Sequence, residues 1–293
     1  KEEADHLERE RQAEERRIAA EKAAKKRKRT IAIVTPIIVA CIAFVVLLTT
    51  VIIPQQKLNK AIALIDSGDY KAAYILLDGI NYKNSKELQE SIKPQYQKVL
   101  LSEAEIGSYV VFGTYEQDNN TSNGKEDIEW IVLAREGDRV LVVSRYALDC
   151  QQYNTSYTSV TWETCSLRKW LNGTFLNAAF SESERAMIPS VTVSADKNPS
   201  YSTSPGSSTT DQVFLLSITE ANKYFSSDSA RQCQGTAYCY ALGTYKASNG
   251  NCWWWLRSPG SNSSSAAIVN YDGSVYDHGY FVHLDDVAVR PAL

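Results

Sequence analysis

The hydropathy pattern is dominated by an uncharged apolar stretch from Thr30 to Ile53, which directly follows a run of basic residues from Lys25 to Arg29. As an α-helix this stretch rises about 36 Å, enough to cross a hydrocarbon core of about 30 Å. Pro36 lies in its first two turns, where a membrane helix tolerates proline. We therefore predict a transmembrane helix over residues 30–53. The alternative of a signal peptide is disfavoured by the length of the run and the charged segment before it.

Charge is distributed unevenly on the two sides of this stretch. Residues 1–29 hold 11 basic and 8 acidic side chains, whereas residues 54–293 hold 20 basic and 26 acidic ones. A basic flank stays in the cytoplasm and suits an anionic inner leaflet. We therefore expect a single-pass protein of the cell membrane with a cytoplasmic N-terminus, an extracellular C-terminal domain and the lipid bilayer as partner of residues 30–53. The acidic C-terminal part gives no reason to expect a nucleic-acid partner.

The segments next to the apolar stretch have helical patterns. Residues 1–29 have polar faces with local charge pairs, which predicts a solvated cytoplasmic juxtamembrane helix, with a coiled-coil partner as the weaker alternative. The chain opens on Lys1 and not on Met, as expected of a piece of a longer protein.

Residues 54–105 are predicted to form a helical stalk. Leu58, Ile62, Leu64 and Ile65 form one apolar stripe, the segment 67–70 breaks it, and a second stripe follows. This pattern resembles one tetratricopeptide-type hairpin. A third helix is predicted from Ser85 to Leu101, interrupted near Pro94.

From Ile106 onward the pattern changes to strands, then helices, then strands. The segments 128–136 and 139–148 flank Gly137 and Asp138 and predict a β-hairpin. Two or three helices are expected between them and the terminal strands, with capping boxes at Ser181/Glu184 and Ser217/Glu220. The segment 195–210 is rich in Ser, Thr, Pro and Asn, which predicts a long exposed loop. The fold class is therefore α+β.

Several motifs in residues 106–293 resemble, in order, an uncharacterised domain family of Gram-positive bacterial surface proteins. They are VVFGTYEQ, IEWIVLARE, TWETCSLRKWLNGTFL, AFSESERAMI, DQVFLLSITEANKYF, WWLRSPG and VAVRPAL. The last third also resembles the end of a C-type-lectin-like, formylglycine-generating-enzyme-like fold, in which Trp255–Ser258 and Ala288–Arg290 bracket the core. Ala288 departs from the glycine usual there. The resemblance implies a ligand surface near the C-terminus, of the kind displayed by variable binding proteins.

The segment from Ser261 to His283 has the composition of an adaptable binding surface, rich in Tyr, Asn, Asp and His. The sequence Trp253-Trp254-Trp255 offers aromatic area on a strand, with Trp253 and Trp255 on one face and core packing as the alternative. The candidate ligand-binding residues are Trp253, Trp255, Asn262, Tyr271, Tyr276, Asp277, His278, Tyr280 and His283.

No catalytic residue, metal ligand or cofactor is predicted. His278 and His283 have opposite parity on a strand, which disfavours a shared metal, and a solvated turn is favoured over calcium binding for Asp285 and Asp286. Arg257 and Arg290 are predicted to be structural. Of six cysteines, Cys41 lies in the apolar stretch, and the pairing of the other five is left open: Cys150, Cys165, Cys233, Cys239 and Cys252.

The function favoured by these features is a membrane-anchored binding protein whose C-terminal domain recognises an extracellular ligand, either a glycan, a wall polymer or a protein. The first alternative is an exported formylglycine-generating-type enzyme that uses a pair among Cys233, Cys239 and Cys252. The second is a structural or sensory scaffold in which residues 54–105 dock a membrane partner.

Overall fold

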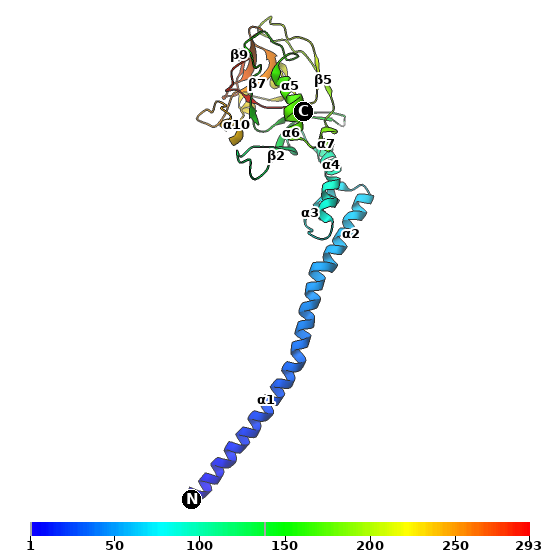
Figure 1. Cartoon of the computed structure of the whole chain (residues 1–293), viewed down its shortest axis with the longest axis vertical. Coiled ribbons are helices and arrows are strands. Elements are labelled where there is room, and N and C mark those ends of the chain that lie inside the picture. Colours follow the sequence, from blue (N-terminus) through cyan, green and yellow to red (C-terminus); the bar gives the residue numbers. More distant parts are fainter. Residues whose placement is uncertain (1, 138) are drawn as a thin grey trace. The chain divides into compact units, whose positions relative to one another are not determined.

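The computed structural model describes residues 2–137 and 139–293, without the side chains of Glu2 and Ala4. The chain divides into two compact units, one ending at Lys93 and the other comprising Pro94–Leu293 (Figure 1). The boundary falls inside the helix α4 (Ser85–Glu103).

The first unit begins with one long helical run. It consists of α1 (Glu2–Leu47), a π-helical turn η1 (Leu48–Ile52) and α2 (Ile53–Asp66) (Figure 1). This run contains a helix long and apolar enough to cross a membrane, and none of its most apolar part is buried in protein. Apolar side chains such as Ile37 and Phe44 are more than half exposed, which in water would be unfavourable and in lipid is not. The run does not end at Pro54, because the residues around it keep helical backbone angles and the π-helical turn η1 comes directly before it.

A short helical hairpin follows, as the sequence predicts. Gly68 has a φ of +81° in the turn after α2, and the Asp69 side chain accepts a hydrogen bond of 3.0 Å from the Ala72 N–H to start α3 (Tyr70–Asp78). A small core joins the helices, formed by Leu58, Ala61, Ala73, Leu77 and Ile92.

Two details of the predicted stalk are wrong. Ile62 is 43% exposed and does not join the apolar stripe, because the crossing helix packs on the small Ala61 beside it. The third helix is also not interrupted, since α4 continues through Pro94 at the cost of one backbone hydrogen bond.

The second unit is a mixed α+β domain, as predicted, and begins with α4. Its strands are β1 (Tyr109–Tyr115), β2 (Glu126–Glu136), β3 (Arg139–Ser144), β4 (Asp149–Cys150), β5 (Val191–Val193), β6 (Thr209–Asp211), β7 (Trp254–Pro259), β8 (Ser265–Val269), β9 (Val275–Phe281) and β10 (Ala288–Val289). Its other helical elements are α5 (Ser166–Trp170), η2 (Leu171–Phe175), α6 (Leu176–Ala179), α7 (Glu182–Arg185), α8 (Ile218–Tyr224), α9 (Asp228–Arg231) and α10 (Ala237–Ala241). The helices are shorter and more numerous than predicted.

The strands form three sheets. β1, β2 and β3 make an antiparallel meander, which confirms the predicted hairpin, although Asp138 of its turn lies outside the described residues. The largest sheet has the order β4-β10-β7-β8-β9, with β10 antiparallel to β4 and parallel to β7. β5 and β6 pair at the two ends of the predicted long loop. Strand β9 is therefore an edge strand of the largest sheet.

Both predicted capping boxes are present. Ser181 starts α7 with Glu184 at its third position, and Ser217 starts α8 with Glu220 at the same position. The segment from Ala195 to Ser208 lacks regular structure and is largely exposed, which confirms the predicted loop.

The core of the domain lies between the sheets and the middle helices. It includes the fully buried Trp130, Trp254 and Trp255, together with Phe175. Gly113 has a φ of +72° at an irregularity of β1, where the Phe180 ring comes so close that a Cβ would lie 2.4 Å from it. The backbone therefore makes room for an aromatic side chain in the core.

Candidate functional site

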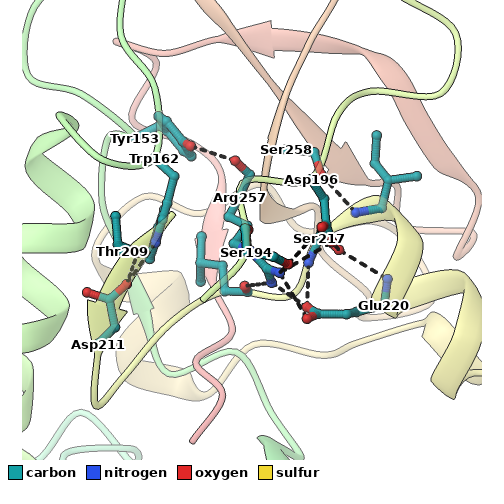
Figure 2. Close-up of polar contacts among 12 residues, drawn as sticks. Tyr153, Trp162, Ser194, Asp196, Thr209, Asp211, Ser217, Glu220, Arg257 and Ser258 are labelled. Atoms are coloured by element: carbon teal, nitrogen blue, oxygen red, sulfur yellow. Dashed lines mark hydrogen bonds and ion pairs between the residues drawn. The ribbon is translucent and has the colours of Figure 1, made fainter. Parts of the chain in front are cut away.

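The most buried polar assembly of the domain surrounds Arg257 on β7. Its guanidinium is 2% exposed and forms ion pairs with Glu220 and, at 3.4 Å, with Asp196 (Figure 2). It also donates to the backbone carbonyls of Ser194 and Leu215, at 3.2 and 2.8 Å. The Nε, Nη1 and Nη2 atoms of the guanidinium all donate hydrogen bonds. Arg257 therefore ties the long loop and α8 to the central strand β7, which supports its predicted structural role.

A second polar assembly lies beside it and is also structural. Asp211 has a fully buried side chain and forms an ion pair of 2.7 Å with Arg168. The Trp162 indole and the Thr209 hydroxyl donate to its other oxygen, at 3.0 and 2.6 Å (Figure 2). Because both carboxylate oxygens are occupied, Asp211 fixes β6 against α5 and offers no free group for chemistry.

Four aromatic side chains form a cluster beside β7 and β9, here called the aromatic platform and defined by Tyr245, Trp253, Tyr271 and Tyr280. Tyr245 stacks on Trp253 with ring centroids 4.3 Å apart and an interplanar angle of 19°. Tyr271 packs against Tyr245 at 6.2 Å, and Tyr280 meets Trp253 edge to face at 5.3 Å. Tyr245 and Tyr271 are 37% and 41% exposed, so the platform reaches the surface. Sequence reasoning included Trp253, Tyr271 and Tyr280 and missed Tyr245.

Two polar atoms near this platform have unused hydrogen-bonding capacity. The Trp253 Nε1–H and the Asp286 Oδ1 are both buried and have no hydrogen-bond partner in the described part of the chain. Asp286 lies close to the platform, because its backbone carbonyl accepts the Tyr245 N–H at 2.8 Å. The pKa of Tyr280 is raised, mainly by burial and to a smaller extent by the charge of Asp286. Burial, followed by the charge of Asp285, raises the pKa of Asp286 itself. Unpaired buried polar groups are rare in folded proteins, and each one calls for a partner such as a water, an ion or a ligand.

The remaining predicted residues form two smaller groups. Tyr276 packs near His278 at 5.8 Å, and the His278 Nδ1 lies 3.2 Å from the Tyr201 hydroxyl. His283 lies against Tyr157 and Phe281, with ring centroids 4.9 and 6.2 Å apart, and its Nδ1 has no hydrogen-bond partner among the described residues. Both groups draw on β9 or the residues just after it, so the edge strand carries aromatic side chains along its length.

Three of the predicted ligand residues have local or structural environments. The Asp277 carboxylate accepts a hydrogen bond from the Ser200 hydroxyl, and the Asn262 side chain accepts from the Ser264 N–H at 2.9 Å within its own turn. Trp255 is fully buried, and its indole donates to the Gln151 carbonyl at 3.0 Å. Trp255 is therefore corrected to a core residue, because β7 is covered on both faces and parity along it does not select an exposed side.

The structure offers little support for a metal centre. The one group with suitable spacing in residues 2–137 and 139–293 is Glu116, Asp118 and Glu126. Their oxygens already accept hydrogen bonds from backbone N–H groups of the same loop, including Asn120 N–H at 2.8 Å and Gln117 N–H at 2.7 Å. Such bonds account for the arrangement of this loop without an ion.

The five cysteines of the domain are buried free thiols in the described structure. Burial raises the pKa of Cys165 to about 12 and that of Cys150 to about 11. Cys233 differs. Burial opposes its ionisation, but interactions with the Cys252 thiol and the charge of Arg290 outweigh this effect and lower its pKa to about 7. The pKa of Cys252 is correspondingly raised, first by its interaction with Cys233 and then by burial.

Several residues of the candidate site carry no recognisable sequence signal. Tyr157, Tyr201 and Tyr245 come from irregular segments that lie far from β9 in the sequence, and long-range packing brings them to the site. Asp286 follows β9 closely, but the sequence raised it only as a possible calcium ligand. Phe281 lies between the predicted residues Tyr280 and His283, and the pattern of exposed aromatics along the edge strand would have included it.

The fold and the site thus define a mixed α+β domain with an exposed aromatic platform, in a chain that also has a helix able to cross a membrane. Residues 137–293 match the family model described as Domain of unknown function (DUF6273). The match spans more than half of the chain, which therefore belongs to this family. The expected membership in an uncharacterised domain family is confirmed, although the match begins within the β2–β3 hairpin and not near residue 106. No curated protein and no solved structure matches the chain.

Proposed function

We propose that this protein is a membrane-anchored binding protein whose C-terminal domain recognises a carbohydrate on the extracytoplasmic side. The aromatic platform, with its adjacent unpaired Trp253 Nε1–H and Asp286 Oδ1, carries this proposal.

The chemistry of the platform suits a sugar ring. Aromatic faces pack against the apolar C–H face of a sugar, and Tyr and Trp supply this area at a low cost in conformational entropy. The hydroxyls at the edge of a sugar ring both donate and accept hydrogen bonds. The Asp286 Oδ1 accepts and the Trp253 Nε1–H donates, so the two unpaired atoms offer one partner of each kind. Small side-chain rotations on binding would bring both atoms to the ligand.

A C-type-lectin-like arrangement is part of this proposal. It is supported by the way β10, at the end of the chain, inserts between β4 and β7 and so closes the domain around its C-terminal strands. The motifs that bracket the core in the resemblance, around Arg257 and Arg290, both lie in the buried interior. The helices α2 and α3 form a hairpin, and its tetratricopeptide-like character is a proposal that rests on the sequence pattern alone.

The extracytoplasmic location is likewise a proposal. It rests on the basic run Lys25–Arg29 before the apolar segment and on the acidic excess after it. The apolar side chains of residues 31–47 are exposed in the protein, as expected of a segment that lipid covers.

The alternative of an enzyme that acts on an external substrate through a thiol has less support. Cys233, Cys239 and Cys252 are 3%, 0% and 0% exposed, so none of them meets a substrate at the surface without local opening.

The direct test is a binding screen. The chain from Lys1 to Leu293, held in detergent micelles or nanodiscs, is screened against immobilised glycans, cell-wall polymers and extracellular proteins. Saturable binding of a saccharide that is lost in Tyr245→Ala, with Tyr109→Ala as an exposed aromatic control on β1, supports the proposal. Binding of a protein alone, or saccharide binding unaffected by Tyr245→Ala, contradicts it.

A further inference from the structure

Cys233 and Cys252 face each other across two short antiparallel segments. Gln234 and Asn251 form an isolated antiparallel bridge, and the next pair outward along it is Cys233 and Cys252. The Cys252 N–H donates to the Cys233 carbonyl at 2.8 Å, one of the two bonds of a hydrogen-bonded antiparallel pair. Such pairs place their Cα atoms about 5.5 Å apart, within the range that a disulfide spans.

The two side chains also lie on the same face of their segments. Directly opposed residues of an antiparallel pair project in the same direction. Both cysteines are buried, and the Cys252 Sγ lies 3.4 Å from the Cys233 carbonyl oxygen. The Cys252 thiol is therefore turned toward the segment that carries Cys233.

Arg290 gives an independent reason to single out this pair. Its guanidinium is 1% exposed and donates to the carbonyls of Ser144 and Arg231, at 3.0 and 3.2 Å, and it lies over the rings of Phe225 and Trp254. In the described part of the chain no carboxylate forms an ion pair with it. A buried cation without an anion is costly, and the charge of Arg290 favours the thiolate form of Cys233, which lies two residues after Arg231.

We propose that Cys233 and Cys252 are a redox modification site that closes to a cross-strand disulfide by exchange with a low-molecular-weight disulfide. The Cys233 thiolate attacks one sulfur of that disulfide, forms a mixed disulfide and releases the first thiol. Cys252 then loses its proton and attacks the Cys233 sulfur, which releases the second thiol. Two protein thiols are oxidised and one external disulfide is reduced to two thiols, so electrons and protons balance.

Closure of this pair would act on the aromatic platform. Cys252 directly precedes Trp253, and the segment enclosed between the two cysteines carries Tyr245. The disulfide therefore restrains both partners of the Tyr245–Trp253 stack. The proposal itself does not depend on the proposed ligand, because the disulfide is measured without it.

The test uses the chain from Lys1 to Leu293 in detergent micelles, equilibrated for hours with oxidised and reduced glutathione at pH 8 and then acid-quenched and alkylated. Long equilibration is needed because buried thiols exchange through local opening. Digestion with trypsin and chymotrypsin separates Cys233 from Cys239 at Tyr238 and from Cys252 at Lys246, and mass spectrometry then identifies the linked peptides.

The expected result is a single linked pair, Cys233–Cys252, that dithiothreitol reverses. Cys252→Ser removes this link, whereas Cys165→Ser, a change at a buried thiol outside the pair, leaves it intact. Free thiols at both positions in the wild-type protein overturn the proposal. A link to Cys239 or Cys150, or a glutathione adduct on Cys233 that Cys252 does not displace, overturns it as well. Because these outcomes are read in the wild-type chain, a variant that fails to fold does not affect the conclusion.

Discussion

Trp253 lies flat against Tyr245, with ring centroids 4.3 Å apart and planes inclined by 19°. The two residues come from different segments: Trp253 directly precedes β7, whereas Tyr245 lies in the loop after α10. The Tyr245 N–H also donates to the Asp286 carbonyl at 2.8 Å. Three segments are thereby held together at the surface, and Tyr280 adds a fourth. This convergence is the physical basis of the proposed binding surface.

The Arg257 network is predicted to be the main polar contribution to the stability of the domain. Replacing Arg257 by Met leaves the carboxylates of Glu220 and Asp196 without their cation. It also removes the hydrogen bonds to the backbone carbonyls of Ser194 and Leu215. The free energy of unfolding should fall by about 3 to 5 kcal/mol, measured by urea denaturation. Arg139→Met, which breaks an exposed pair with Glu136, should change it by less than about 1 kcal/mol. Equal effects of the two changes would show that the network has no special role.

Two glycines with positive φ angles provide a matched test of core packing. Gly113 and Gly107 have φ angles of +72° and +85°, but a Cβ at Gly113 meets Phe180 at 2.4 Å, whereas one at Gly107 meets nothing within 4 Å. Gly107→Ala should therefore cost only the backbone strain, about 1 kcal/mol, and Gly113→Ala about 2 kcal/mol more. Thermal unfolding of both variants gives the comparison. If their costs were the same, Phe180 would not be packed against this backbone.

The sequence predicts much of this fold but little of the platform. Local signals are reliable where they act within a few residues, as in the capping boxes of Ser181 and Ser217 and the β2–β3 hairpin. The prediction that Trp255 shares an exposed face with Trp253 was wrong, because β7 is buried on both faces. Alternation along a strand distinguishes its two faces only when one of them meets solvent. The sequence could not place Tyr245 and Asp286 beside Trp253, since only tertiary packing brings them there.

Ligand binding should depend on pH through Asp286. Burial and the nearby Asp285 charge raise the pKa of Asp286, so its carboxylate becomes protonated at a higher pH than an ordinary aspartate. If the ionised oxygen accepts a ligand hydroxyl, affinity is full at neutral pH and falls as the pH decreases toward this raised pKa. Titrations between pH 7 and pH 4 measure the change.

Two variants sharpen this prediction. Asp286→Asn should bind more weakly at neutral pH and lose the pH dependence. Asp285→Asn removes a neighbouring negative charge and should move the loss of affinity to lower pH. A wild-type affinity that is constant over the whole range would exclude the carboxylate from the binding contact.

The orientation in the membrane is testable in intact cells. With the basic run Lys25–Arg29 retained in the cytoplasm, protease added outside should degrade residues 54–293 and leave a cytoplasmic marker protein intact. Antibodies against a C-terminal tag follow the cleavage. Protection of the tag until the cells are lysed would place the domain inside and contradict the proposed location.

The central claim is that the platform around Trp253 binds a carbohydrate, and the affinity of one saccharide for matched variants tests it most directly. Isothermal titration of the chain from Lys1 to Leu293 should show that Tyr245→Ala and Tyr280→Ala each weaken binding by about five- to thirtyfold, since each removes a packing surface worth about 1 to 2 kcal/mol. Tyr109→Ala should leave the dissociation constant unchanged. Undiminished affinity in both platform variants, with circular dichroism spectra like that of the wild type, would contradict the claim.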